Sequence, residues 1–202
     1  MVNLEPTVAA VSTRAVAEAA ARRGADIDAL LAHHGLDLET LRTPGYRLPA
    51  RAVTPIWLEA ARLAGEPELP VWAAIELGWG AYRVIDLLTA SMATFGDAMQ
   101  ALSDYFRIIN EGIRLPITPR DDGFTMGIAH RSGAPLPAAY VDYTLAACVY
   151  RLSQVGVVVD PAVYLMRPAP ADDSGHRKAI AGPIYFEADE NRIEFTAAHR
   201  SL

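Results

Sequence analysis

The segment 136–155 constrains the fold most strongly, because one predicted helix carries hydrophobic side chains on two of its sides. Each side repeats at alternating spacings of three and four residues. At about 100° per residue, the two stripes lie about 140° apart around the helix. A helix with two apolar faces must bury both of them. The first stripe contains Val141, Leu145, Cys148, Leu152 and Val155, and the second contains Leu136, Tyr140, Tyr143, Ala147 and Tyr150.

A sheet can cover one of these faces, but the other face needs a different neighbour. A layer of N-terminal helices is one such neighbour. The two alternatives are a dimer interface and the wall of a ligand pocket. Tyrosine suits both alternatives, because it combines a large apolar area with a hydroxyl that water or a ligand can satisfy. The sequence leaves all three open.

The first 110 residues show only helical periodicity. Asp26 is a suitable N-cap for a short helix that ends at Gly35. The segment 53–63 has the spacing of an amphipathic helix, and Thr94 with Asp97 forms the pattern of a capping box. This part of the chain, about 1–111, is therefore predicted to be helical.

After Gly112 the period changes to that of short strands. The segments 113–118 and 124–130 flank turn residues and predict a hairpin. The long helix, a strand at 163–167 and a short helix at 173–181 follow. The segments 184–187 and 192–195 suggest a closing hairpin. The order ββαβαββ over 112–202 predicts an α+β fold with a mostly antiparallel sheet, within one domain that spans 1–202.

Charge and cysteine content narrow the function classes. The 202 residues include 18 basic and 24 acidic ones, for a net charge of −6, which argues against a DNA-binding face in this segment. Cys148 is the single cysteine, so an intramolecular disulfide and a thiolate metal cage are excluded. This cysteine content and the absence of signal-peptide and membrane-helix patterns indicate a cytoplasmic protein.

The catalytic motifs that we searched for are not present in the sequence. The chain has neither a Gly-x-Ser-x-Gly elbow nor a His-Glu-x-x-His metal helix. Gly78-Trp79-Gly80 lacks the third glycine of a dinucleotide loop, and we interpret it as a helix break. We therefore expect no catalytic residue, no metal and no cofactor. The rival hypothesis from another class is a small cytoplasmic enzyme that uses Arg107, His130 and a nearby carboxylate.

A ligand pocket would draw on the tyrosines of this helix and on other aromatic and basic side chains of the chain. Trp79 is one candidate. The set of candidate ligand-binding residues is Tyr82, Arg83, Tyr105, Arg107, His130, Tyr140, Tyr143 and Tyr150.

Three stretches, in this order, resemble the N-terminal effector domain of AraC-type bacterial transcription regulators, often labelled arabinose-binding-like. They are RLPARAVTPIWLEAARLAGEPEL at 47–69, LLTASMATFGDAMQALSDYFR at 87–107 and GPIYFEADENRIEF at 182–195. The similarity extends over nearly the whole chain, although no single motif is diagnostic. No ligand-contact motif accompanies it, so no binding residue is carried over.

The resemblance implies a sensor that binds a small effector, forms a homodimer and reports to a C-terminal pair of helix-turn-helix motifs. We expect that DNA-binding domain to follow a residue near Leu202, and DNA to be contacted only through it. The arabinose label does not identify the effector, since members of the family respond to varied molecules. A dimerisation module without a ligand remains an alternative to the sensor.

Overall fold

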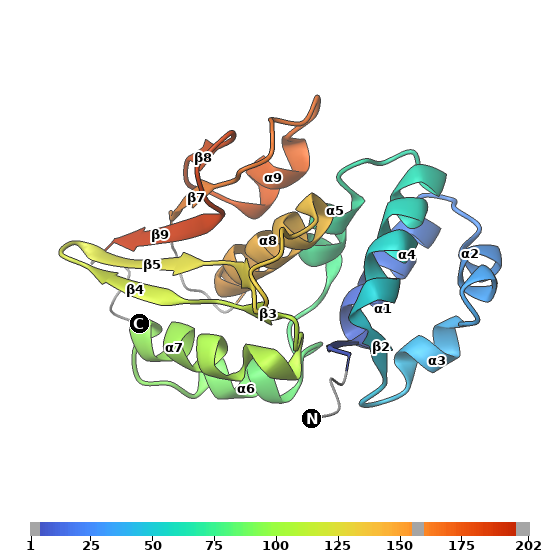
Figure 1. Ribbon diagram of the computed structural model, residues 1–202, viewed down its shortest axis with the longest axis horizontal. Helices are drawn as coiled ribbons and strands as arrows, with labels where there is room; N and C mark the ends of the chain where they lie inside the picture. The colour runs from blue at the N-terminus through green and yellow to red at the C-terminus, as the bar shows by residue number, and fades with distance from the viewer. Residues whose placement is uncertain (1–4, 155–159, 197–202) are drawn as a thin grey trace.

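The computed structural model describes residues 5–154 and 160–196, which form an α+β fold (Figure 1). One group of helices lies on the right of Figure 1, and a sheet with further helices lies on the left. The N-terminal helices are α1 (Ala10–Arg22), α2 (Ile27–His33), α3 (Leu38–Arg42), α4 (Ala50–Leu63) and α5 (Leu69–Glu76). As predicted, α5 ends before the Gly78-Trp79-Gly80 segment.

Two of the helices begin at the caps that the sequence predicts. The Asp26 carboxylate accepts a hydrogen bond from the Ala29 backbone N–H at 3.1 Å, where α2 starts. The Thr94 hydroxyl accepts one from the Asp97 N–H at 3.1 Å, where α7 (Phe95–Tyr105) starts. Such caps satisfy backbone donors that have no partner within the helix.

The prediction that the first 110 residues are only helical was wrong at two places. Strand β1 (Thr7–Ala9) pairs antiparallel with β2 (Arg47–Pro49). Strands of three residues are too short for the alternation of side chains that identifies a strand in the sequence.

The main sheet has five strands in the order β4-β5-β9-β7-β8. A separate two-stranded ladder joins β3 to β6 and extends the predicted first hairpin. The strands are β3 (Ile113–Arg114), β4 (Ile117–Arg120), β5 (Gly123–Gly127), β6 (Ala129–His130), β7 (Ala162–Tyr164), β8 (Ile184–Tyr185) and β9 (Arg192–Thr196). All pairings within this sheet are antiparallel except that of β7 with β8.

The predicted closing hairpin was wrong. Strand β8 lies parallel to β7, and β9 runs between β5 and β7 instead of beside β8. The helix α9 (Ser174–Ala179) makes the crossover from β7 to β8. Burial explains the central place of β9, because Ile193 and Phe195 are fully covered and Phe195 packs on Phe124 of β5. A tight turn alone could not reveal this preference for the centre of the sheet.

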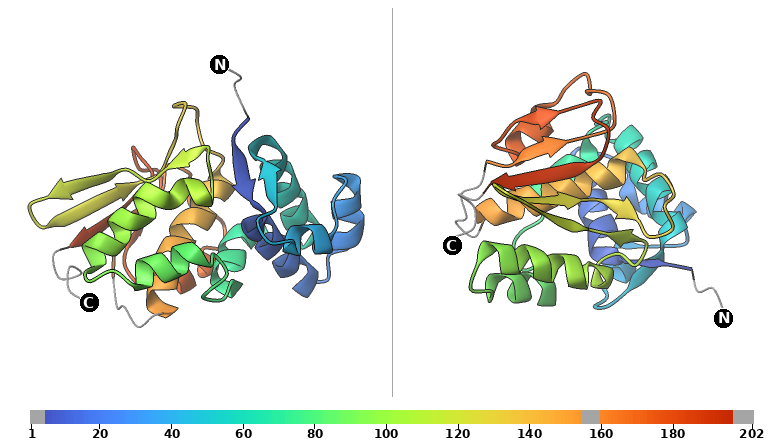
Figure 2. Two further views of the ribbon diagram at one scale, coloured as in Figure 1. Left: turned by 90° about the horizontal axis from the view of Figure 1, so that it is seen from below. Right: turned by 60° about the vertical axis from the view of Figure 1, so that its left-hand side comes forward.

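The helices α6 (Val84–Ala90) and α7 lie side by side along one flank of the fold (Figure 2). A single 3-10 turn, η1 (Phe106–Ile108), follows α7. Phe95 of α7 contacts both Phe124 and Phe195, so this helix is fixed to the sheet by an aromatic cluster. Just after η1, the Ile109 carbonyl accepts a hydrogen bond from the Ala9 N–H of β1 at 2.7 Å.

The helix with two apolar faces is α8 (Ala138–Gln154), and both of its stripes are covered. It packs against α4, α5 and α9. Trp57 of α4 stacks on Tyr140, with ring centroids 4.8 Å apart, and contacts Tyr143 at 4.9 Å. N-terminal helices therefore cover part of the tyrosine stripe, and Tyr140, Tyr143 and Ala147 of this stripe also line a cavity. Val155 lies outside the described residues.

Candidate functional site

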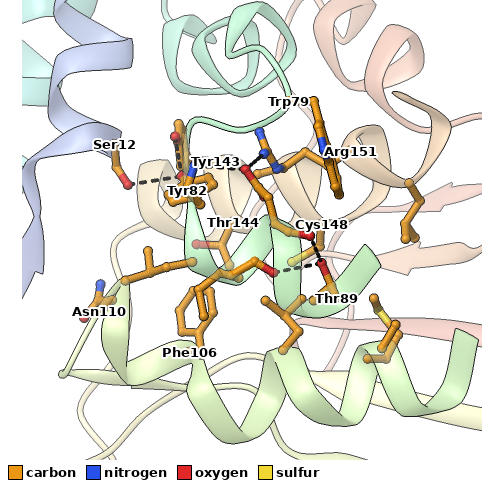
Figure 3. A pocket seen from close by; sticks show the side chains of 18 of the residues that line it. Ser12, Trp79, Tyr82, Thr89, Phe106, Asn110, Tyr143, Thr144, Cys148 and Arg151 are labelled. Atoms are coloured by element: carbon orange, nitrogen blue, oxygen red, sulfur yellow. Dashed lines mark hydrogen bonds and ion pairs between the residues drawn. The ribbon is translucent and has the colours of Figure 1, made fainter. Parts of the chain in front are cut away.

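A cavity of about 400 Å³ lies where α8 faces α6 and α7, with α1 and α4 at its inner end (Figure 3). Apolar side chains form most of its wall, as is typical of sites for small molecules. These side chains include Val8, Trp57, Ile85, Phe95, Met99, Leu102, Phe106, Ile109, Ala147 and Leu152.

A chain of hydroxyl groups joins three separate parts of the structure at this cavity. The Ser12 Oγ of α1 lies 3.2 Å from the Tyr82 Oη, which lies 2.7 Å from the Tyr143 Oη of α8. Tyr82 belongs to the segment between α5 and α6. Burial raises the pKa of both the Tyr82 and the Tyr143 hydroxyl, so both stay protonated and can act as donors.

Arg151 of α8 holds the same segment through a second set of contacts. Its guanidinium forms an ion pair with Asp86 of α6 and donates to the backbone carbonyls of Leu77 at 3.4 Å and Gly78 at 3.3 Å. It also lies 5.2 Å from the ring centre of Trp79 and 4.9 Å from that of Tyr82.

The ion pair is poorly exposed to solvent. The side chains of Arg151 and Asp86 are only 10% and 5% exposed. The second contact of Asp86 comes from the Tyr82 backbone N–H, which donates to its Oδ2 at 3.0 Å. The segment 77–86 is thus attached to α8 by charge, by cation–π contact and by hydroxyl hydrogen bonds, and Figure 3 shows these groups around one end of the pocket.

Three polar side chains of the wall keep hydrogen-bonding capacity. The buried Tyr140 hydroxyl of α8 has no hydrogen-bond partner among the described residues. Thr144 lies on α8 between Tyr143 and Ala147, and among the described residues its hydroxyl has no hydrogen-bond partner. The Asn110 Oδ1 accepts from the Gly112 N–H at 2.9 Å, whereas its amide nitrogen has no partner within the same part of the chain. The cavity is therefore apolar, with a small number of groups that could orient a ligand.

Cys148 also faces the cavity, as a buried residue in agreement with the prediction from its stripe. Burial disfavours the thiolate and raises the pKa of the Cys148 thiol to about 12, although the nearby Arg151 acts in the opposite direction. At neutral pH this thiol is protonated and unsuited to nucleophilic chemistry.

A second buried polar cluster lies away from this cavity. Glu68, Asp142 and His176 each present one ligand atom, and these atoms lie within 4.8 Å of one another. Carboxylate and imidazole groups are common metal ligands. Here, however, the Arg167 guanidinium already donates to both carboxylates, with Nη2 2.9 Å from Glu68 Oε1. The position between the carboxylates is therefore taken by a side-chain cation, and the cluster joins α5, α8 and α9.

The comparisons with known proteins agree with this architecture. Residues 24–202 match the family described as the arabinose-binding domain of AraC transcription regulators, at the N-terminus. The chain belongs to this family. The resemblance inferred from three stretches of sequence is thereby confirmed, and a regulatory domain of an AraC-type protein is the role that this membership supports.

A solved structure extends the comparison to the fold. The crystal structure of the transcriptional regulator CdpR from Pseudomonas aeruginosa matches with a TM-score of 0.54 and 17% sequence identity. The match covers 86% of this chain and 54% of that one, so this chain spans about half of the length of CdpR. No curated protein sequence matches the chain. Among the described residues, no helix of this AraC-family domain has the length and apolarity needed to cross a membrane.

Three of the eight predicted ligand-binding residues line the cavity of this AraC-family domain: Tyr82, Tyr140 and Tyr143. Trp79, also considered from the sequence, lines it as well. The other five lie elsewhere. Tyr150 packs at the edge of the core, and Arg83 and Tyr105 are exposed.

Arg107 and His130, the two named residues of the enzyme hypothesis, are also outside the cavity. Arg107 lines a separate shallow depression with Glu111 and Arg131. His130 interacts through Nδ1 with Ser132, whose Oγ lies 2.6 Å away. The structure does not bring these two residues together with the tyrosines.

Sequence reasoning missed Arg151, Asp86, Ser12, Thr144 and Asn110 in the wall. A signal existed for Arg151, because it lies four residues after Ala147 and so continues the tyrosine stripe. A charged residue that continues an apolar stripe needs a buried partner. For Ser12 and Asn110 no comparable signal exists, because they reach the cavity only through the packing of distant segments.

Proposed function

We propose that this domain senses a small-molecule effector in the cavity between α6, α7 and α8 and regulates transcription through a DNA-binding domain of the complete regulator, in the cytoplasm. The observation that carries the proposal is the cavity itself. A void of about 400 Å³ falls within the range of small-molecule sites, and its wall combines apolar area with a few oriented polar groups. Membership in a family of transcription regulators supports a sensor over an enzyme.

The helix α6 offers a route from the cavity to the surface. Ile85, Asp86 and Thr89 face the cavity, whereas Val84 and Leu87 on the other side of the same short helix are 55% and 72% exposed. An effector that contacts the inner face would bias the position of the outer face. Such coupling requires that the effector bind two arrangements of the regulator with different affinity.

A cavity-filling substitution tests the assignment of the site. Ala147→Leu would place a larger side chain in the void, and Ala138→Leu makes the same change at an exposed position of the same helix. We would screen small molecules by thermal shift, because a ligand that binds the native state raises the melting temperature with concentration. Stabilising compounds should lose their effect on Ala147→Leu and keep it on Ala138→Leu. Equal stabilisation of both variants would refute the site.

We further propose that the regulator is a homodimer and that the exposed apolar face of α6 takes part in the interface. Leu87→Glu would place a charge on that face, and Glu39→Leu would serve as a control at an exposed position of α3. Sedimentation velocity should find a dimer for the unmodified chain and for the control, and a monomer for Leu87→Glu. A dimer that survives this substitution would place the interface elsewhere, and a dimer that binds no compound in its cavity would favour the pure dimerisation module.

A further inference from the structure

We infer that the effector of this cavity is an electrically neutral, mainly apolar molecule of about 16 non-hydrogen atoms that carries one or two hydroxyl or carbonyl groups. The inference rests on the proposed function and defines the class of ligand that the site accepts. Three features of the wall support it: its charge balance, its small number of free polar groups and its volume.

The charge balance disfavours a charged ligand of either sign. Among the described residues of the wall, Asp86 and Arg151 are the charged ones, and they form a buried ion pair with each other. A carboxylate ligand would lie close to Asp86, and an ammonium ligand would lie close to Arg151. Either would bring one uncompensated charge next to a buried ion pair, which costs more free energy than the same charge at an exposed surface.

The aromatic rings do not offer a cation site either. The guanidinium of Arg151 already lies against Trp79 and Tyr82, the rings that could otherwise receive a cation from a ligand. Tyr140 instead stacks on Trp57, and Tyr143 contacts the same ring at a tilt of 53°. These four rings are thus engaged by protein groups, and apart from hydroxyl groups they are apolar surface.

The free polar groups are too few for a sugar. The hydroxyls of Ser12, Tyr82 and Tyr143 contact one another. The groups of the wall without a partner among the described residues are then the Tyr140 and Thr144 hydroxyls and the Asn110 amide nitrogen, fewer than the polar groups of a sugar. A pentose carries a hydroxyl on almost every carbon, and each buried hydroxyl needs a partner. The family's arabinose label therefore does not describe this cavity, whereas one or two polar groups on an apolar skeleton would be satisfied.

The volume of the cavity sets the number of non-hydrogen atoms in the ligand. A dry apolar cavity of about 150 Å³ accepts benzene, which has six non-hydrogen atoms. Scaling in proportion, a cavity of about 400 Å³ accepts about 16 such atoms, close to the size of two linked aromatic rings with a small substituent.

Three probes with one skeleton and different charges test the inference. They are 4-biphenylmethanol, biphenyl-4-carboxylate and the protonated 4-biphenylmethylamine, titrated calorimetrically into the 202-residue chain at pH 7.5, with L-arabinose as a fourth probe. The neutral alcohol should bind at least about tenfold more tightly than either charged probe, a difference of about 1.4 kcal/mol. L-Arabinose should show no binding. The Ala147→Leu variant should no longer bind the alcohol, and the Ala138→Leu variant should still bind it.

Two further variants examine the charge and the hydroxyl separately. Asp86→Asn would leave Arg151 without its anion, and the affinity for biphenyl-4-carboxylate should then rise by about tenfold or more. Thr144→Val would remove a free hydroxyl, and the affinity for 4-biphenylmethanol should fall about three- to tenfold while that for unsubstituted biphenyl stays constant.

The outcomes separate the inference from the proposed function. Binding of the carboxylate or the amine that equals or exceeds that of the alcohol, and that Ala147→Leu abolishes, would overturn the ligand class and leave the sensor site standing. Tight binding of L-arabinose in the same cavity would do likewise. If none of the probes binds, or if all bind Ala147→Leu as they bind the unmodified chain, both the ligand class and the proposed site are refuted.

Discussion

Replacement of Arg151 by methionine would remove the cation that holds the segment 77–86 against α8. Methionine keeps much of the side-chain length and its apolar character. It removes the ion pair with Asp86, the donors to two backbone carbonyls and the contacts of the guanidinium with Trp79 and Tyr82. The perturbation is therefore concentrated on charge and hydrogen bonding, with little change in packed volume.

The expected loss of stability follows from the Asp86 carboxylate, which would remain buried after its partner is removed. Asp86 would keep its hydrogen bond from the Tyr82 N–H, but its carboxylate, of which only 5% is exposed, would have no counter-charge. Removal of one partner of a buried ion pair costs about 3–5 kcal/mol. Because the cation–π contacts are lost in the same substitution, we expect a value of about 4 kcal/mol, near the middle of that range. For a chain of this size, 4 kcal/mol corresponds to a fall of about 8–16 °C in melting temperature.

Urea unfolding, followed by circular dichroism, would measure the change in free energy of unfolding. Arg177→Met is the matched control, because Arg177 forms an exposed ion pair with Asp173 and its side chain is 72% exposed. That control should change stability by less than about 1 kcal/mol. The double variant with Asp86→Asn should recover part of the loss, since the two residues act as one unit. A cost for Arg151→Met within 1 kcal/mol of the control would refute the view that Arg151 holds the segment 77–86 against α8.

Two other predictions follow from the buried parts of the structure. The Cys148 thiol, whose pKa burial raises to about 12, should react with a disulfide reagent at pH 8 at least about 100-fold more slowly in the native chain than in guanidinium chloride, and equal rates would contradict its burial. Gly123→Ala should destabilise the sheet by at least about 1–3 kcal/mol in urea unfolding, because a Cβ there would lie 1.8 Å from the Phe195 carbonyl oxygen. Gly96→Ala in α7 has no such clash and should be neutral or stabilising, so equal losses at both glycines would show that contact with Phe195 is not the cause.

Local signals were enough to predict the helices. Asp26 and Thr94 cap α2 and α7 as expected, because a cap depends on residues within one turn of chain. The two stripes of α8 likewise predicted a helix buried on both sides. The sequence could not predict where β9 would lie, because its pairing with β5 and β7 depends on contacts between segments far apart in the chain.

The cavity was only partly predictable for a related reason. Tyr140 and Tyr143 could be found because their helix has a surplus apolar face, whereas Tyr82 was chosen only as an aromatic residue. Arg107 and His130 were chosen for their chemistry alone, and they lie on η1 and β6, outside the wall of the cavity. A residue type can suggest a chemical role, but the fold decides whether the residue reaches the site.

The stability of the domain and the proposed binding of a ligand in its cavity are physically connected. A void lowers stability because its lining side chains lack partners on one side, and a large apolar void lowers it considerably. Here Arg151 and the hydroxyls of Tyr82 and Tyr143 hold opposite walls of the void in place. A ligand that fills the void would add about 2.7 kcal/mol to the free energy of unfolding at a concentration 100 times its dissociation constant. Because the same ligand would contact α6, stabilisation of the domain and movement of its exposed face would have one origin, so variants that fill the cavity should affect both.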